Sequence, residues 1–248
     1  MSLVSIIIPY FHKKNFINNS INSILNQTYQ NFEIILVNDE ESLETKKFLE
    51  NISKEDLRIK LINNDKNLGA GESRNKAINY TKGEYIAFCD SDDLWKPKKL
   101  EIQLNFMKEF NLDFTFTAYE IINENGDVIG SRKAEKIIEY KNLINSCDIG
   151  LSTVIINNKI FNDKKLRFAS LKTKEDFVLW LKIAKNRIKL FGINQKLGCW
   201  RKSSNSLSSS NIQKIRDGYR VYREYLNFGM FKSVIYLIIL SINFLLKK

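Results

Sequence analysis

Short apolar segments alternate with amphipathic ones through the first 110 residues of this chain of 248 residues. The segments between the apolar runs, and the one that follows the last run, carry apolar residues at helical spacing. Near-continuous apolar runs of this length are typical of strands buried in a parallel sheet, and they lie at residues 3–9, 32–37, 58–62 and 84–89. The alternation therefore predicts an α/β fold built from βαβ units, with ligands at the carboxyl ends of the strands.

The second half of the chain has a less regular pattern. We expect strands at residues 114–122, from 128 onward, at 152–156 and at 189–193, and a helix at 175–184. This order predicts a mixed, partly antiparallel extension of the sheet.

Cysteine and histidine usage narrows the class of protein. Cys89, Cys147 and Cys199 are odd in number and far apart in the sequence, which fits a reducing compartment. Met1 leads directly into the first apolar run without a basic leader, so we expect a cytoplasmic chain. His12 is the only histidine, which argues against a multi-histidine zinc site and against a Ser-His-Asp triad.

Charge is distributed unevenly along the chain. Residues 1–124 hold 15 basic and 19 acidic residues, whereas residues 125–248 hold 24 basic and 9 acidic ones. A basic half suggests an anionic partner such as a phospholipid surface or a phosphorylated substrate, although lysines spread over solvated faces are the plain alternative. No zinc-finger spacing or RNA-recognition motif is present, so we expect no nucleic-acid partner.

The fourth apolar run ends in three closely spaced acids, Asp90, Asp92 and Asp93. Like charges at this spacing repel one another unless a cation lies between them. Alternate residues of an extended backbone point the same way, so Asp90 and Asp92 can share one hard divalent ion with a substrate phosphate. The alternative is a solvated acidic turn ahead of the next helix.

Three further polar clusters lie beside the predicted strand ends, at Pro9 to Phe11, Asn38 to Glu40 and residues 67–75. Tyr10 can stack on a base, Asp39 can accept from a base N–H, and Arg74 can bind a phosphate or ribose oxygen. The third glycine of a dinucleotide fingerprint is replaced by Arg74, and no P-loop is present, so both of those sites are excluded. Ordinary turn chemistry explains each cluster singly, but four in sequence favour a common cleft.

The ordered motifs VSIIIPYF, VND, NLGAGESRN and FCDSDD closely resemble those of the family 2 inverting glycosyltransferases of the GT-A fold. The resemblance covers roughly the first 110 residues and resumes near Glu175 and Asp176. Many members of the family have two acids where this chain has Asn38 and Asp39, but the second acid is retained.

The resemblance implies a role for each matching residue. It places Pro9, Tyr10 and Phe11 beside the base, Asp39 on the uracil, and Asn67, Gly69 and Arg74 in support of the nucleotide. It places Asp90 on the ribose and assigns Asp90 and Asp92, with Asp93 as a neighbour, to a Mn²⁺ or Mg²⁺ ion on the diphosphate. It also implies that Asp176 is the catalytic base, with Glu175 beside it.

Two further residues are candidates from their chemistry. Trp180 is a plausible stacking surface for an acceptor sugar, with core packing as the equal alternative. Arg201 precedes a polar, serine-rich run that would form a flexible loop closing over the diphosphate, with Arg201 as a phosphate clamp or simply as a solvated residue.

The C-terminal segment at residues 232–248 is apolar and flanked by lysines, but it is shorter than the roughly 20 residues that span a bilayer. Together with the basic helix at residues 216–223, it predicts an interfacial helix on the inner membrane surface, peripherally bound and assisted by anionic lipid. A core helix or an oligomer contact is the alternative.

These expectations divide the chain into a GT-A domain at residues 1–212 and a membrane-associating segment at 213–248. Residues 1–110 would form the nucleotide-sugar and metal half of the domain, and 111–212 the acceptor half. The predicted function is metal-dependent transfer of a hexose, from a UDP-sugar, to a growing surface glycan or lipid-linked acceptor. The alternatives are a GDP- or dTDP-sugar donor, or a catalytically silent binding scaffold.

Overall fold

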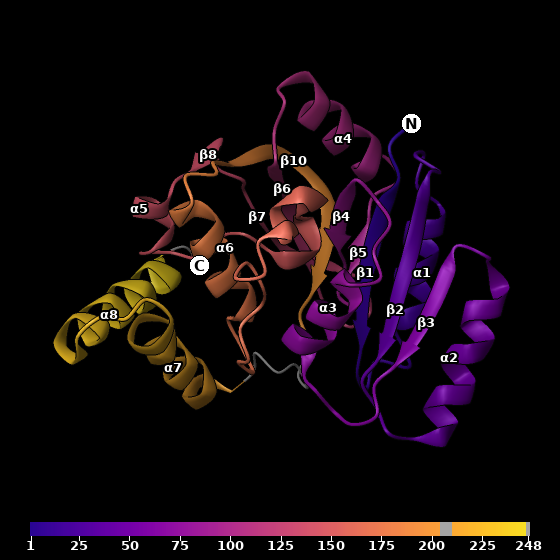
Figure 1. Ribbon diagram of the computed structural model, residues 1–248, viewed down its shortest axis with the longest axis horizontal. Coiled ribbons are helices and arrows are strands. Elements are labelled where there is room, and N and C mark those ends of the chain that lie inside the picture. Colours follow the sequence, from indigo (N-terminus) through magenta and orange to yellow (C-terminus); the bar gives the residue numbers. More distant parts are fainter. Residues whose placement is uncertain (204–209, 247–248) are drawn as a thin grey trace.

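The computed structural model describes residues 1–203 and 210–246, which form one mixed sheet of ten strands with helices on both faces (Figure 1). The first four strands of the sheet lie in the order β3-β2-β1-β4 and are all parallel. They are β1 (Val4–Tyr10), β2 (Phe32–Asn38), β3 (Ile59–Asn63) and β4 (Tyr85–Phe88). The predicted parallel sheet is confirmed, and the carboxyl ends of its strands share one edge.

Successive side chains of β1 point to opposite faces of the sheet and pack in two separate core layers. Ile6, Ile8 and Tyr10 pack in one hydrophobic cluster with three helices, whereas Ile7 packs in the cluster on the other face of the sheet. The first layer contains α1 (Ile17–Leu25), α2 (Leu43–Glu55) and α4 (Lys99–Glu109), and the second contains α3 (Ala70–Ile78) and α6 (Glu175–Lys185). Two-sided burial explains why β1 is apolar at nearly every position.

The second half extends the sheet in the order β9-β6-β10-β5. β9 is antiparallel to both β4 and β6, β10 is parallel to β6, and β7 and β8 pair at the margins with β6 and β10. The strands are β5 (Leu94–Trp95), β6 (Phe114–Ile122), β7 (Val128–Arg132), β8 (Ile137–Ile138), β9 (Ile155–Asn157) and β10 (Leu190–Arg201). Short helices connect them: α5 (Tyr140–Leu143), η1 (Leu151–Thr153) and η2 (Asn158–Asn162).

β10 is longer than the sequence predicts. The apolar pattern stops near Ile193, but the strand continues to Arg201 through register shifts between Ile193 and Gly198. These irregularities break the alternation of apolar residues, which is why the pattern hides the continuation. The extension carries Arg201 to the end of β4, beside the acidic cluster.

The C-terminal segment packs against α6 at the end of the molecule opposite β3 (Figure 1). It consists of α7 (Asn211–Arg220), the π-helical turn η4 (Val221–Tyr225) and α8 (Met230–Leu246). Val221, Tyr222 and Leu240 are buried in the same cluster as α6, and the Tyr222 hydroxyl donates to the Ile144 carbonyl at 2.8 Å. The segment therefore shares its core with the second half of the sheet.

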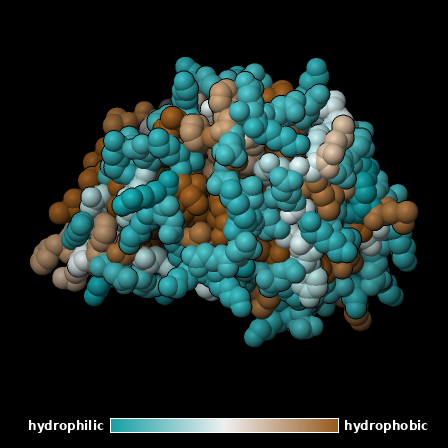
Figure 2. Space-filling model, turned by 45° about the horizontal axis from the view of Figure 1, so that its top comes forward, coloured by the Kyte–Doolittle hydropathy of each residue, from teal (hydrophilic) through white to brown (hydrophobic). Residues whose placement is uncertain are grey.

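α8 buries one stripe and exposes another. Ser233 and Leu240 face the protein, whereas Ile235 and Ile238 are 56% and 52% exposed. Figure 2 shows hydrophobic side chains gathered at the end of the molecule where α8 lies. Within residues 1–203 and 210–246, no helix combines the length and apolarity needed to cross a bilayer. The terminal Lys247 and Lys248 fall outside the described residues.

Candidate active site

Asp39 lies directly after β2 and is 2% exposed. Its Oδ1 accepts hydrogen bonds from Asn64 Nδ2 and from the main-chain N–H of Leu68, both at 2.8 Å, and its Oδ2 accepts from the N–H of Gly69 at 2.8 Å. Asn67 adds a bond from its side chain to the Asp39 carbonyl at 3.2 Å. A carboxylate oxygen has two acceptor positions, so Oδ2 keeps capacity for one more donor.

A hollow of about 180 Å³ lies at this point. Phe11, at 37% exposure, forms one wall of it, and Asp39 and Asn67 form others. Pro9 and Tyr10 do not present a surface to it, because both are buried and Tyr10 is only 1% exposed. Burial also raises the pKa of Tyr10 to about 12. Of the three residues predicted beside the base, Phe11 is thus the accessible aromatic.

Gly69 holds the loop in place at the start of α3. Its φ of +83° is in the left-handed region, which a side chain would strain. Because its N–H bonds to Asp39, this conformation is what brings the 67–69 loop onto the carboxylate.

The three acids after β4 have different environments. Asp93 is 1% exposed and accepts from Ser152 Oγ at 2.5 Å and from the N–H of Arg201 at 2.9 Å. Burial, reinforced by the charges of Asp90 and Asp92, raises the pKa of Asp93 well above its usual range. The side chains of Asp90 and Asp92 are 33% and 14% exposed, so these two acids are the ones open to a ligand.

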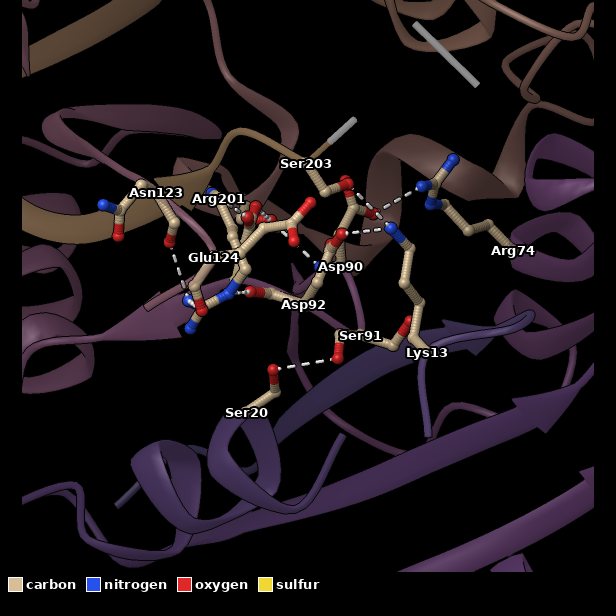
Figure 3. A network of polar contacts seen from close by, with 12 residues as sticks. Lys13, Ser20, Arg74, Asp90, Ser91, Asp92, Asn123, Glu124, Arg201 and Ser203 are labelled. Atoms are coloured by element: carbon tan, nitrogen blue, oxygen red, sulfur yellow. Dashed lines mark hydrogen bonds and ion pairs between the residues drawn. The ribbon is translucent and has the colours of Figure 1, made fainter. Parts of the chain in front are cut away.

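Each of these two acids already has a cationic partner (Figure 3). Lys13 Nζ lies 2.7 Å from Asp92 Oδ2 and also donates to Ser203 Oγ at 3.1 Å. Arg74 Nη2 lies 2.6 Å from Asp90 Oδ1. Lys13 is absent from the sequence prediction, since nothing in a run of two lysines after β1 indicates which one turns toward β4.

The donor set fits a divalent ion that is bound together with a substrate. Among the residues described, no group of three His, Cys, Asp or Glu side chains is placed to hold a metal alone. Mg²⁺ and ions like it are commonly bound by one or two carboxylates plus substrate phosphates. Asp90 and Asp92 supply the two carboxylates that such a site requires.

Arg74 differs from its predicted role. Its side chain is 3% exposed, and Nη1 binds Glu175 Oε1 at 2.7 Å while Nη2 binds Asp90, so the guanidinium is directed at two carboxylates and not at a ribose or phosphate. Its charge also lies 5.4 Å from the centre of the Phe168 ring. Arg74 therefore joins the acidic cluster to the first residue of α6.

Glu175 and Asp176 form the first turn of α6. Burial raises the pKa of Glu175 to about 7 although Arg74 opposes the shift. Asp176 is half-buried, its Oδ1 accepts from the N–H of Phe177 at 2.7 Å, and burial raises its pKa as well. Within the described residues Asp176 has no ion pair, which leaves it as the carboxylate of this turn that can accept a proton from a ligand.

Trp180 is not an acceptor-binding surface. It is fully buried, with ring centroids 5.1 Å from Phe114, 6.2 Å from Phe168 and 6.3 Å from Phe88. Trp180 lies one turn after Asp176 on α6, and its side chain points into the core. The apolar neighbours Phe177 and Leu181 share this burial.

Arg201 is also placed differently from the prediction. It ends β10 with 4% exposure, and its guanidinium donates to three main-chain carbonyls, those of Asp92, Asn123 and Glu124, at 2.9–3.0 Å (Figure 3). It also lies over the Phe16 ring at 4.7 Å. Arg201 supports the backbone of the acidic cluster, and the serine-rich run at 204–209 lies outside the described residues.

Comparison with known proteins identifies the class. Residues 5–168 match the family model described as "Glycosyl transferase family 2". The chain therefore belongs to this family and is a glycosyltransferase with a GT-A fold.

Two relatives match nearly the whole chain. The "UDP-Glc:alpha-D-GlcNAc-diphosphoundecaprenol beta-1,3-glucosyltransferase WfgD" of Escherichia coli is 37% identical over 90% of this chain and 86% of its own length. The "putative teichuronic acid biosynthesis glycosyltransferase TuaG" of Bacillus subtilis (strain 168) is 33% identical over 90% and 88%.

Two solved structures share the fold. S. aureus TarS in complex with UDP-GlcNAc has a TM-score of 0.73 at 22% identity, covering 96% of this chain and 70% of that chain. The mannosyltransferase PcManGT from Pyrobaculum calidifontis, in complex with GDP-Man and Mn²⁺, has a TM-score of 0.70 at 12% identity, covering 94% and 69%.

The bridge made by Arg74 gives a stability prediction. Arg74→Met leaves Glu175 and Asp90 without their partner, and we expect the free energy of unfolding to fall by about 3–5 kcal/mol at pH 8. The loss should be smaller at pH 6. Glu175 has a pKa of about 7, which rises further when Arg74 is removed, so its side chain is protonated at pH 6 and leaves no unpaired charge. Urea unfolding at both pH values measures this.

The control is Lys14→Met, which removes an ion pair with Glu44 whose side chains are 61% and 80% exposed. It should leave the free energy of unfolding nearly unchanged at either pH, because solvent screens an exposed pair. Equal losses for Arg74→Met at both pH values would contradict the assignment to Glu175.

Proposed function

We propose that this enzyme transfers a hexose, with inversion and with a divalent ion, from a UDP-sugar to a hydroxyl of a lipid-linked glycan at the membrane surface. Glucose is the first candidate, because the relative WfgD is named as a glucosyltransferase that uses UDP-Glc and a GlcNAc-diphosphoundecaprenol acceptor. The observation that carries the proposal is the arrangement of Asp39, Asp90, Asp92 and Asp176 around one edge of the sheet. Arg74 bridges Asp90 and Glu175, the residue before Asp176.

The donor would lie along this edge from the base to the sugar. Its uracil would stack on Phe11 and donate its N3–H to the free acceptor position of Asp39 Oδ2. Its ribose and diphosphate would extend toward Asp90 and Asp92, with Lys13 within reach of the phosphate oxygens. A divalent ion bound here would neutralise the charge that develops on the departing diphosphate.

Asp176 would act on the acceptor. Its carboxylate removes the proton of the acceptor hydroxyl as that oxygen attacks C1 of the sugar from the face opposite the nucleotide. The C1–O bond to the diphosphate breaks as the new glycosidic bond forms, so the configuration at C1 inverts. A raised pKa suits this task, because a more basic carboxylate accepts the proton more readily.

Donor choice and metal dependence are measured together. We expect release of UDP from UDP-glucose with Mn²⁺ and a GlcNAc-diphosphate lipid acceptor, and loss of release with EDTA. In Asp92→Asn, turnover should fall by at least about a hundredfold, since the ion that stabilises the leaving charge is lost. Glu109→Gln, an exposed acid on α4, is the matched control and should turn over normally.

The other donors define the competing outcomes. Turnover of only GDP-mannose or dTDP-glucose in the same panel would replace the UDP-sugar, and full activity in EDTA would remove the metal from the proposal. The absence of both turnover and metal-dependent nucleotide binding would favour a silent scaffold.

The role of Asp176 gives a pH prediction. The base works as a carboxylate, so activity should rise with pH through its pKa, and that limb should lie above the ordinary aspartate value of about 3.9. Asp176→Asn should lower kcat by about 10²–10⁴-fold while calorimetry shows unchanged UDP affinity. Asp176→Glu should keep some activity and move the limb. If the acidic limb of the pH–activity profile does not move in Asp176→Glu, another group is responsible for it, and Glu175 is the first candidate.

The exposed apolar stripe of α8 supports the proposed peripheral association with the membrane. This stripe, here called the outer face of α8, consists of Met230, Phe231, Val234, Ile235, Ile238, Ile242 and Leu245. Ile212 and Ile215 of α7 are exposed as well, and Arg216, Arg220, Arg223 and Lys232 supply positive charge nearby. An apolar stripe with cationic neighbours suits a helix lying in the interface of an anionic bilayer.

Co-sedimentation with phosphatidylglycerol vesicles tests this surface. The double variant Ile235→Glu/Ile238→Glu should lose most of its binding, because it places two carboxylates against lipid. Leu43→Glu, at a position on α2 that is 74% exposed and remote from α8, should bind as the unaltered protein does. Equal binding by all three proteins would show that α8 does not meet the membrane.

A further inference from the structure

Asp217, in α7, is fully buried although it carries an ionisable group. Its Oδ2 accepts three hydrogen bonds, from the main-chain N–H of Thr173 at 3.0 Å, from Thr173 Oγ1 at 2.9 Å and from Gln213 Nε2 at 2.9 Å. A buried carboxylate is costly unless it is bonded in this way. Two of the three bonds tie α7 to a residue that lies three positions before Asp176.

The residue between Thr173 and α6 is held by the same helix. Lys174 has a φ of +65°, a left-handed conformation that is strained for a non-glycine residue. Gly218 packs against it, since a Cβ built on Gly218 would lie 3.5 Å from Lys174 Cε and 2.8 Å from Leu237 of α8. Strained conformations persist where the surroundings fix them, and α7 supplies those surroundings here.

The opposite side of the same turn is tied to the donor half of the molecule. Glu175 is held by Arg74, and Gly71 of α3 packs so closely that a Cβ there would lie 2.7 Å from the Ala169 carbonyl and 3.2 Å from Glu175 Cγ. Asp176 therefore follows a turn that is fixed from two directions, by Arg74 and by Asp217.

We propose that Asp217 is a positioning residue for catalysis, whose bonds to Thr173 fix the start of α6 and so direct the Asp176 carboxylate at the acceptor hydroxyl. The inference rests on the proposed role of Asp176. It gives α7 a part in positioning the catalytic carboxylate.

The geometry offers a sharp pair of variants. All three bonds use Oδ2, whereas Oδ1 makes no hydrogen bond and lies 3.8 Å from Arg220 Nη1. Asparagine can present its single oxygen to the N–H and hydroxyl of Thr173, so Asp217→Asn keeps the bonds to that residue and removes the charge. Asp217→Ala removes both.

We expect Asp217→Ala to lower kcat at least about tenfold with the KM for the donor nearly unchanged, since a displacement of 1 Å at a reacting group can cost about a hundredfold. Asp217→Asn should stay within a few-fold of the unaltered enzyme. Glu55→Gln, at an exposed position of α2 remote from α7, is the control. Hydrogen exchange at the amides of Thr173 to Asp176 should quicken in Asp217→Ala and not in Asp217→Asn.

Unchanged kcat in a folded Asp217→Ala, or an equal loss in both Asp217 variants, would overturn the proposal. If Asp217→Ala does not fold, Thr173→Val removes the hydroxyl bond alone and Thr173→Ser restores it. We then expect kcat to fall in Thr173→Val and to stay near that of the unaltered enzyme in Thr173→Ser. Should the unaltered enzyme transfer no sugar, the proposed function fails. In that case, unaltered hydrogen exchange at these amides in Asp217→Ala would show independently that Asp217 does not fix this turn.

Discussion

The ion pairs of Arg74 are the interaction on which the rest of the site depends. One buried guanidinium holds Asp90, at the end of β4, and Glu175, at the start of α6, which are separated by more than 80 residues in the chain. A buried charge of this kind is stable only while both partners are in place, because a lone ion in the interior is costly. The position of the acidic cluster and the position of the first turn of α6 are therefore not independent, because the same side chain holds both.

Much of the fold could be predicted because it depends on local pattern. The parallel strands are buried on both faces and so are apolar throughout, and the acids that follow them fall at a shared sheet edge by topology alone. Asp39 and Asp90 were placed at that edge by this argument, and the structure has them there. The resemblance to family 2 glycosyltransferases supplied the class, which the family match confirms.

The direction of individual side chains could not be predicted in the same way. Arg201 precedes a polar run that suits exposure, and the sequence around Trp180 leaves sugar stacking and core packing equally open, yet long-range contacts bury both side chains. Three aromatic rings surround Trp180, and three carbonyls surround the Arg201 guanidinium. Arg74 lies in a motif near the ligand, but its partner Glu175 comes from 101 residues later. Irregular register in β10 concealed its continuation to Arg201. Each difference comes from a contact between distant segments, which no local pattern encodes.

The pairing of Lys13 with Asp92 has a consequence for how this enzyme handles charge. A pair of acids at the end of a buried strand would repel in the absence of substrate, but here the chain supplies its own ammonium and guanidinium to the two carboxylates. Under the proposed function, a donor arriving with a divalent ion would exchange counter-ions at this cluster, and Lys13 would pass from Asp92 to the phosphates. Because both carboxylates have cationic side chains as partners, the acidic cluster of the folded chain is charge-balanced without a metal ion.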